Sequence, residues 1–187
     1  ATTDIEYKFP FGWGELWGIA SRTNYDLSKH MEYSKESLEY LDPETNEKYI
    51  PYVVEPSLGV ERLFLTVLCD AYHKDMVNNE EREVLKLHPF LAPIKVTVLP
   101  LVKKYHNEKA LEIYKNLSKY FMCSYDESGS IGKRYRRADV VGTPFCVTVD
   151  DETINNNTVT IRDRDTMEQI TLSLDELKDY ITEKIEF

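Results

Sequence analysis

Residues 130–149 read SIGKRYRRADVVGTPFCVTV, a stretch that contains a helix, its end and a buried strand in succession. Residues 130–141 are typical of a helix, and Gly142 follows at the position where helices commonly end in a left-handed conformation. The apolar residues of 145–149 then alternate with smaller ones, which indicates a strand. A helix that leads directly into a buried strand predicts an α/β arrangement for this part of the chain.

The same alternation of elements continues on both sides of this stretch. Short apolar or alternating runs predict four further strands, and amphipathic spacing predicts two further helices. We expect the strands at residues 94–101, 123–125, 158–162 and 168–172, and the helices at residues 108–121 and after the capping box Ser173–Glu176. This order predicts a mixed five-stranded sheet with three helices on its faces.

The first half of the chain begins with a glycine- and tryptophan-rich strand at residues 11–20. Alternation places Phe11, Trp13, Glu15 and Trp17 on one face of this strand and the glycines on the other. Glycines weaken a strand, and several of them on one face indicate the close approach of another backbone or of a ligand.

Residues 49–57 form a second expected strand, after which the chain turns into a helix. The apolar stripe of this helix, Val60 to Tyr72, is expected to be buried. Arg62 lies off the stripe in the first turn, where the helix dipole favours anions over cations. An arginine in that place suits a bound anion or an aromatic ring. The segment 23–40 is expected to be largely helical, with Asp26 as its N-cap.

The charge of the chain is unevenly distributed. The net charge of −10 over 187 residues by itself argues against a nucleic-acid partner. Residues 95–137, however, contain 10 basic and 4 acidic side chains, a net charge of +6, between two segments that each carry −8. In the expected helix of this segment four cations cover one side, namely Lys133, Arg134, Arg136 and Arg137. Such a face suits a phosphate backbone or a single-stranded RNA loop, and an ordinary solvated helix face is the alternative.

Several function classes are excluded by the sequence. No apolar run reaches the roughly 20 residues of a membrane-spanning helix, and the first residues lack the features of a secretion signal. Three cysteines without CxxC spacing and four scattered histidines are typical of a reduced cytoplasmic protein without a zinc site. The segment 129–133 lacks the spacing of a phosphate-binding P-loop, and no dinucleotide fingerprint or nucleophile motif is present.

One polar constellation remains for chemistry, and it comprises Glu15, Glu55, Ser57, Gly59 and Arg62. Glu55 and Ser57 point the same way along their expected strand. The glycine lets a ligand approach the backbone, and the arginine can pair with an anion or stack on a base. A purely structural role for these residues is the alternative.

The constellation lies within segments whose sequences are distinctive. These segments are FGWGELWGIA (11–20), SRTNYDL (21–27), EPSLGVER (55–62), GSIGKRYRR (129–137), VGTPFCVTV (141–149) and TVTIRDRDTMEQ (158–169). Together they resemble the C-terminal part of bacterial homodimeric glycyl-tRNA synthetases, which are class II aminoacyl-tRNA synthetases. The resemblance extends over essentially the whole chain.

This resemblance implies a fold with two parts. Residues 1–90 resemble the end of the antiparallel class II catalytic domain, with its motif 3 at residues 55–62. Residues 91–187 resemble the α/β anticodon-binding domain of class IIa enzymes. The expected fold class is therefore α+β, with a partial antiparallel catalytic sheet followed by a domain with a mixed five-stranded sheet and three helices.

The resemblance also implies an activity, which is the ATP-dependent activation of glycine to glycyl-adenylate and its transfer to tRNA(Gly). It implies ATP and Mg²⁺ as cofactors, a homodimer in the full-length enzyme, a cytoplasmic location and no membrane association. A positioned active site would contribute mainly orientation and charge stabilisation to such a transfer.

By the same resemblance, Glu15 and Arg62 are the expected catalytic residues, and Glu15 is the expected Mg²⁺ ligand. The expected ATP-binding residues are Glu15, Leu16, Gly59, Val60, Glu61 and Arg62. The expected glycine-binding residues are Glu55, Pro56, Ser57, Leu58 and Gly59. For contacts with tRNA, charge and position favour Lys133, Arg134, Arg136 and Arg137, with Arg162 and Arg164 behind them.

No segment of the chain resembles motif 1 or motif 2 of the class II enzymes, which supply much of the dimer interface and the arginine for the α-phosphate. We therefore expect this chain alone to be inactive in adenylate formation. The alternative function is a non-catalytic, synthetase-like module that only binds nucleic acid. Retention of the set Glu15, Glu55, Ser57 and Arg62 favours the ligase.

Overall fold

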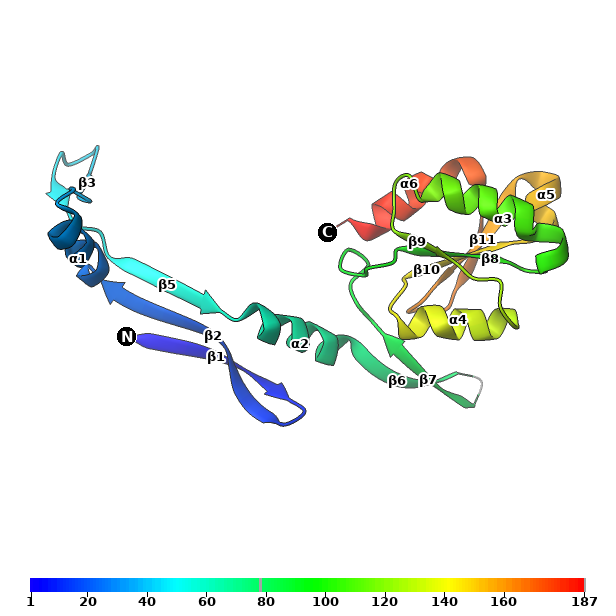
Figure 1. Ribbon diagram of the computed structural model, residues 1–187, viewed down its shortest axis with the longest axis horizontal. Coiled ribbons are helices and arrows are strands. Elements are labelled where there is room, and N and C mark those ends of the chain that lie inside the picture. Colours follow the sequence, from blue (N-terminus) through cyan, green and yellow to red (C-terminus); the bar gives the residue numbers. More distant parts are fainter. Residues whose placement is uncertain (78, 187) are drawn as a thin grey trace. The chain divides into compact units, whose positions relative to one another are not determined.

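The computed structural model describes residues 1–77 and 79–186 and contains two compact units (Figure 1). The first unit is Ala1–Cys69 and the second is Asp70–Phe187. The sequence placed a domain boundary after residue 90, in a proline-containing segment. The compact units part before that point, because a hairpin that the sequence did not reveal belongs to the second unit.

A mixed five-stranded sheet forms the centre of the second unit, as the sequence predicted. Its strands are β8 (Val96–Pro100), β9 (Cys123–Tyr125), β10 (Phe145–Val149), β11 (Thr158–Asp163) and β12 (Gln169–Ser173). Their order is β12-β11-β10-β8-β9. The pairs β8–β9 and β8–β10 are parallel, whereas β10–β11 and β11–β12 are antiparallel.

Helices cover both faces of this sheet, with α3 and α6 on one face and α4 on the other (Figure 1). Their bounds are α3 (Lys103–Leu117), α4 (Ile131–Val140), α5 (Asp151–Asn156) and α6 (Leu174–Ile185). Because side chains alternate along a strand, Phe145 and Val147 contribute to the core under α3 and α6, while Cys146 packs with Ala138 of α4. Every residue of β8 and β10 is buried, as expected for strands covered on both faces.

The short helix α5 was not predicted from the sequence. Its six residues include no apolar stripe, so periodicity does not reveal it. A capping box instead defines its start, since the Asp150 carboxylate accepts from the Thr153 amide and the Thr153 hydroxyl accepts from the Asp150 amide. The predictions for α4 and its end are confirmed, because the helix stops at Val140 and Gly142 has a φ of +81°.

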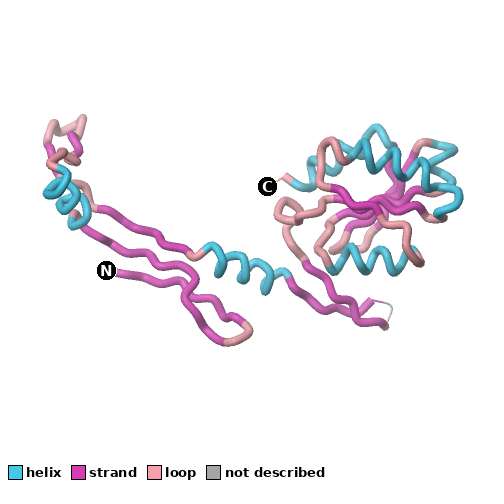
Figure 2. The backbone as a smooth tube through the Cα atoms, in the orientation of Figure 1, coloured by secondary structure: helices cyan, strands magenta, loops and turns pink. Residues whose placement is uncertain are grey.

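A three-stranded antiparallel sheet of order β1-β2-β5 forms the centre of the first unit (Figure 2). Its strands are β1 (Thr2–Phe9), β2 (Gly12–Thr23) and β5 (Val53–Leu58). The other elements are α1 (Tyr25–Ser34), a small hairpin of β3 (Tyr40–Leu41) and β4 (Lys48–Tyr49), and α2 (Val60–Ala71), whose end extends into the second unit. The expected partial antiparallel sheet is therefore present.

Two expectations for the helices of this region are wrong. Helix α1 has Asn24 at its N-cap, and Asp26 lies inside the first turn, where it accepts hydrogen bonds from Arg22. The apolar stripe of α2 is largely exposed among the described residues, with Val60 at 73% and Phe64 at 65% exposure. Periodicity identifies an apolar face correctly, but burial also requires a surface that packs against it.

The second unit begins with an antiparallel hairpin of β6 (Tyr72–Val77) and β7 (Glu80–Leu85). Two side chains of β7, Arg82 and Val84, are almost completely buried. The end of β7 lies so close to Gly142 that a Cβ atom on this glycine would be 3.0 Å from the carbonyl oxygen of Leu85. The glycine is thus needed both for its positive φ and for the approach of the hairpin.

Within the hairpin, Arg82 is paired across the strands with Asp75. The Arg82 Nε atom donates to Asp75 Oδ1 at 2.8 Å, and the Nη2 group donates to Oδ2. This hydrogen bonding lowers the pKa of the Asp75 carboxyl below its ordinary value, with smaller contributions from the charges of Lys86 and Arg136. A side chain whose ionised form is favoured in the native state stabilises the fold only while it is ionised.

Replacing Gly142 by alanine should lower the free energy of unfolding by about 1–3 kcal/mol, because alanine is strained at positive φ and its methyl group would meet the hairpin backbone. The matched control is Gly132→Ala in α4, where an added Cβ meets nothing within 4 Å. This control should stabilise the protein by about 0.5–1 kcal/mol. Urea unfolding measures both values, and equal effects of the two substitutions would contradict the prediction.

Replacing Asp75 by asparagine should destabilise the protein at pH 7 and have progressively less effect in acid. Because the pKa of the native carboxyl is lowered, its contribution to the free energy of unfolding is complete above the unfolded-state pKa of about 3.9. The contribution disappears as the pH falls through the pKa of the carboxyl in the folded protein. Urea unfolding of both proteins between pH 7 and pH 2 measures this convergence. Asp179→Asn, at a side chain 86% exposed, is the control and should have little effect throughout. A pH-independent difference for Asp75→Asn would refute the assignment.

Candidate functional site

The pairing of β2 with β5 brings Ser57 and Glu55 onto the same sheet as Glu15. In this pairing Gly18 is opposite Ser57 and Ala20 is opposite Glu55. Residues directly opposite each other in an antiparallel pair lie on the same face. Ser57 and Glu55 therefore share the face of the sheet that carries Gly18, in agreement with the alternation in β5.

A β-bulge changes the alternation that the sequence predicted around Glu15. Ile5 pairs with Trp17 and Glu6 pairs with Glu15, so Leu16 is the extra residue of β2. The Glu15 Oε1 atom lies 3.2 Å from the position of a Cβ on Gly18. Glu15 stays on the face of Trp13, but Trp17 lies on the other face, so the expected alternation is wrong across Leu16, where the bulge interrupts the period of two.

The Asp4 carboxylate approaches the same place and was not singled out in the sequence. Its Oδ1 atom lies 3.6 Å from the Cβ position on Gly18, and Asp4 is opposite Gly18 in the pairing of β1 with β2. Two carboxylates thus flank one glycine. The sequence predicted the approach of another backbone or of a ligand to the glycines of β2, whereas the groups that approach Gly18 are side chains of the same sheet.

Helix α2 places Arg62 next to the bulge. The Nη1 group of Arg62 donates to the main-chain carbonyl of Glu15, 47 residues earlier in the chain. The structure therefore brings together the two residues for which the sequence predicted a catalytic role. Leu16 is half-buried at the bulge, and Gly59, Val60 and Glu61 link β5 to the first turn of α2.

Glu55 is part of a small ion-pair group at the surface. Its Oε2 atom is 3.5 Å from Arg22 Nε, and Arg22 donates two hydrogen bonds to Asp26. Arg22 and Glu55 are both about half exposed, so this pair contributes little to stability. The neighbouring residues Pro56 and Leu58 continue β5, and the Glu55 carboxylate is accessible to another cation.

Three of the six basic residues expected to contact tRNA are buried in the second unit. Arg134 donates hydrogen bonds to the carbonyl oxygens of Pro100 and Gly129. The expected helix face is wrong at this residue, because position 134 is three residues after Ile131 and four before Ala138 and therefore belongs to the packed stripe. Its charge is neutralised by main-chain dipoles inside the domain.

Arg164 is also an internal anchor, at 2% exposure. Its Nη1 group donates to the Gly142 carbonyl at 2.9 Å and its Nη2 group to the Leu87 carbonyl at 2.7 Å. Asp165 pairs with the same guanidinium at 2.7 Å. Arg164 thus fixes the chain that follows β11 against the end of α4 and the segment after β7.

Arg162 lies beside a buried carboxylate and over an aromatic ring. Its Nη1 and Nη2 groups donate to Asp139 Oδ1 and Oδ2 at 2.9 and 3.1 Å. Its Cζ atom is 4.8 Å from the centre of the Tyr135 ring, a cation–π arrangement. The Tyr135 hydroxyl is hydrogen-bonded to Thr148 Oγ1 at 2.8 Å, which holds the ring in place. Burial raises the pKa of Tyr135, so its hydroxyl remains protonated at neutral pH.

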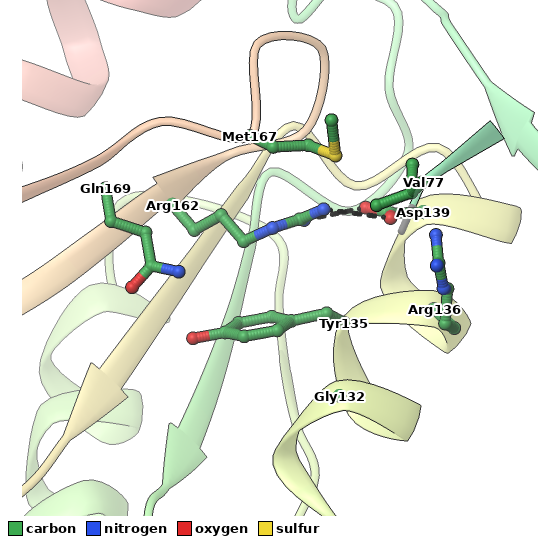
Figure 3. A pocket seen from close by; sticks show the side chains of 8 residues that line it. All are labelled: Val77, Gly132, Tyr135, Arg136, Asp139, Arg162, Met167 and Gln169. Atoms are coloured by element: carbon green, nitrogen blue, oxygen red, sulfur yellow. Dashed lines mark hydrogen bonds and ion pairs between the residues drawn. The ribbon is translucent and has the colours of Figure 1, made fainter. Parts of the chain in front are cut away.

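These two side chains form part of a hollow of about 370 Å³ on the α4 side of the second unit (Figure 3). The residues around it come from β6, α4, β11, the following turn and β12, namely Val77, Gly132, Tyr135, Arg136, Asp139, Arg162, Met167 and Gln169. Figure 3 shows the Arg162 guanidinium above the Tyr135 ring, with the Gln169 amide to one side. The hollow thus combines an aromatic ring, cations and an amide.

The other three basic residues of α4 are closer to solvent. Lys133 is exposed, and Arg136 is half-buried at the hollow. Arg137 is 49% exposed and pairs with Asp126 at 2.6 Å. Periodicity and charge correctly predicted a basic surface on α4. The sequence did not predict Gln169 or Val77 at the hollow, because their approach to α4 depends on how the strands are ordered.

No helix described in residues 1–77 and 79–186 is long and apolar enough to cross a membrane. Within the same residues, no three histidine, cysteine or acidic side chains are grouped so that they could hold a metal ion by themselves.

The chain is similar to known proteins over its whole length. The family model "Anticodon binding domain" matches residues 95–184. Glycine–tRNA ligases from Clostridium tetani and Caldanaerobacter subterraneus are 61% and 62% identical over 100% of this chain, and one from Bacillus anthracis is 57% identical. The chain spans about 40% of the length of these curated relatives.

A solved structure supports the same fold. The RNA binding domain of threonyl-tRNA synthetase from Cryptosporidium parvum superimposes with a TM-score of 0.69 at 21% identity, over 97% of this chain and 42% of that chain. Residues 95–184 thus match the anticodon-binding domain model, the chain as a whole is similar to part of the glycine–tRNA ligases, and its fold is like that of the synthetase RNA binding domain.

Proposed function

We propose that this chain acts within a cytoplasmic, homodimeric glycine–tRNA ligase, where it supplies the anticodon-binding domain and one side of the ATP and glycine site. The similarity of the whole chain to ligases that are 57–62% identical carries this proposal. The placement of Glu15, Ser57 and Glu55 on one sheet face, with Arg62 of α2 bonded to the Glu15 carbonyl, adds support, because a module that only binds nucleic acid has no need of this set.

In the first unit, Arg62 is suited to bind ATP. It lies in the first turn of α2, and its hydrogen bond to the Glu15 carbonyl holds the guanidinium beside β2. A guanidinium can neutralise phosphate and stack on a base. Leu16, Gly59, Val60 and Glu61 form the adjoining chain, and an added Cβ on Gly59 would meet nothing nearer than 3.9 Å, so its surroundings are open.

The carboxylate of Glu15 is suited to hold Mg²⁺ together with ATP. Magnesium sites on nucleotides use one or two carboxylates plus phosphate oxygens, and Glu15 with Asp4 beside Gly18 matches that donor set. When bound, the ion would supply positive charge to the phosphates. Glu15 also lies on the sheet face of Ser57, so the metal and amino-acid sites would be neighbours.

Glu55 is suited to bind the ammonium group of glycine. Its carboxylate is paired loosely with Arg22 at 3.5 Å and remains about half exposed, so a ligand cation can reach it. Ser57 lies two residues further along the same face of β5 and offers a hydroxyl group to the ligand. Pro56 and Leu58 would then contribute apolar surface on the other face.

In the second unit, the hollow between α4 and β11 is suited to an unstacked nucleobase. Proteins recognise single-stranded RNA by stacking bases on aromatic or guanidinium planes and by hydrogen bonds to base edges. Tyr135 provides an aromatic ring with the Arg162 guanidinium packed over it at the wall of the hollow, and Gln169 provides an amide that can both donate and accept. Lys133, Arg136 and Arg137 surround the hollow with positive charge for the phosphates. Arg134 and Arg164 support this surface from inside.

The double variant Lys133→Ala/Arg136→Ala should bind glycine tRNA about tenfold more weakly than the unchanged chain. Removing two phosphate contacts should also reduce the slope of log K against log salt by about 1.5. Filter binding at several salt concentrations measures both. The control Lys115→Ala/Lys184→Ala removes the same charge from α3 and α6, on the other sheet face, and should bind normally. Equal weakening in both double variants would place the RNA elsewhere.

The chain alone should show no glycine-dependent exchange of pyrophosphate into ATP. Its segments resemble motif 3 but neither motif 1 nor motif 2, so the α-phosphate would lack its arginine. The full-length Clostridium tetani ligase serves as the positive control in the same assay. Robust exchange by the 187-residue chain would overturn this prediction and would assign a complete active site to it.

A further inference from the structure

The hairpin β6–β7 lies outside the matched anticodon-binding domain, which begins at residue 95, yet it forms part of the hollow. Val77 at the end of β6 is one of the lining residues (Figure 3). Arg82 of β7 extends into the interior and is only 1% exposed. A hairpin that merely connected two domains would not need a buried arginine, since burying this cation costs free energy unless it is fully paired.

Arg82 is connected to the hollow by hydrogen bonds through one carboxylate, that of Asp139. Its Nη1 group is 3.3 Å from Asp139 Oδ2, and this oxygen also accepts from Arg162 Nη2 at 3.1 Å. Asp139 is completely buried, so these guanidinium groups determine its orientation. Arg162 in turn lies over the Tyr135 ring. The contacts therefore run from Arg82 to Asp139, then to Arg162 and Tyr135.

Arg82 also holds the main chain next to Arg162. Its Nη1 group donates to the Arg164 carbonyl at 2.8 Å. Arg164 follows the end of β11 and begins the turn that carries Met167, another lining residue. The remaining donors of Arg82 are fixed on Asp75, within the hairpin. One guanidinium thus joins the hairpin, the side-chain partner of Arg162 and the backbone that follows Arg162.

We infer that Arg82 is a positioning residue for RNA binding, which holds Arg162 over Tyr135 through Asp139 and makes the β6–β7 hairpin a part of the anticodon site. This inference rests on the proposed function, because it concerns the same hollow. Arg82 cannot itself contact RNA, since its side chain is buried. Its removal leaves Asp139 Oδ2 with one donor fewer and frees the turn after β11.

The test is a double-mutant cycle on tRNA binding by the full chain. The variants are Arg82→Met, Arg162→Met and the combination, and the RNA is a glycine tRNA transcript. We expect Arg82→Met alone to weaken binding about tenfold without changing the salt slope, because no phosphate contact is lost. In the Arg162→Met background, Arg82→Met should weaken binding by less than about twofold, because its effect passes through Arg162.

A matched control on the same hairpin is Lys74→Met. Lys74 is about half exposed and pairs with Glu81 and Glu83, with no contact to Asp139. It should bind tRNA as the unchanged chain does. Arg82→Lys is the second variant, because it keeps the charge but cannot donate to Asp75, Asp139 and the Arg164 carbonyl together. It should fold and show an intermediate loss, so the cycle can be run with it if Arg82→Met does not fold.

Three outcomes would overturn the inference in different ways. Normal binding by folded Arg82→Met or Arg82→Lys, with weak binding by Arg162→Met, would leave the proposed site intact and remove Arg82 from it. Independent losses that multiply in the combination would mean that Arg82 acts by another route. Normal binding by Arg162→Met and by Lys133→Ala/Arg136→Ala would instead show that the RNA does not use this hollow, so the proposed function of the site would fail as well.

Discussion

The buried carboxylate of Asp139 is the interaction on which the α4 side of the second unit depends. It accepts hydrogen bonds from Arg162 of β11 and Arg82 of β7. These two arginines are 80 positions apart in the sequence and belong to separate hairpins. A carboxylate without access to water is very unfavourable unless it is paired, and loss of one partner typically costs about 3–5 kcal/mol. Helix α4, strand β11 and the β6–β7 hairpin must therefore pack together around Asp139, and this packing determines the shape of the hollow.

This internal use of arginine explains why fewer of the basic residues expected to contact tRNA reach the surface than the sequence predicted. The planar guanidinium groups of Arg134 and Arg164 each donate several hydrogen bonds to main-chain carbonyls, a geometry that lysine cannot reproduce. Asp139, the partner of Arg162 and Arg82, is also internal, so part of the excess negative charge after residue 138 serves the interior. Net charge counted along the chain thus mixes buried and exposed groups. The charge available to a polyanion is the smaller set around Lys133, Arg136 and Arg137.

In the first unit a local irregularity has a comparable effect. The bulge at Leu16 turns Glu15 toward Gly18, onto the sheet face of Ser57 and Glu55, and it exposes the carbonyl that Arg62 binds. Without the bulge, alternation would place Glu15 on the opposite face. Bulges often occur beside functional sites because they redirect a side chain. Much of the apolar face of α2 is exposed among the described residues.

The sequence by itself determined most local elements of the second unit and the resemblance to synthetases. Periods of two and 3.6 predicted the five strands and the helices α3, α4 and α6, and Gly142 correctly marked a helix end, because these features depend on neighbouring residues. The distinctive segments around Glu15 and Glu55–Arg62 indicated the synthetase resemblance. The tertiary structure decided the rest: which arginines are buried, which face Glu15 occupies, and that the β6–β7 hairpin joins the hollow. Those outcomes depend on desolvation and on contacts between residues distant in sequence, which no local pattern contains.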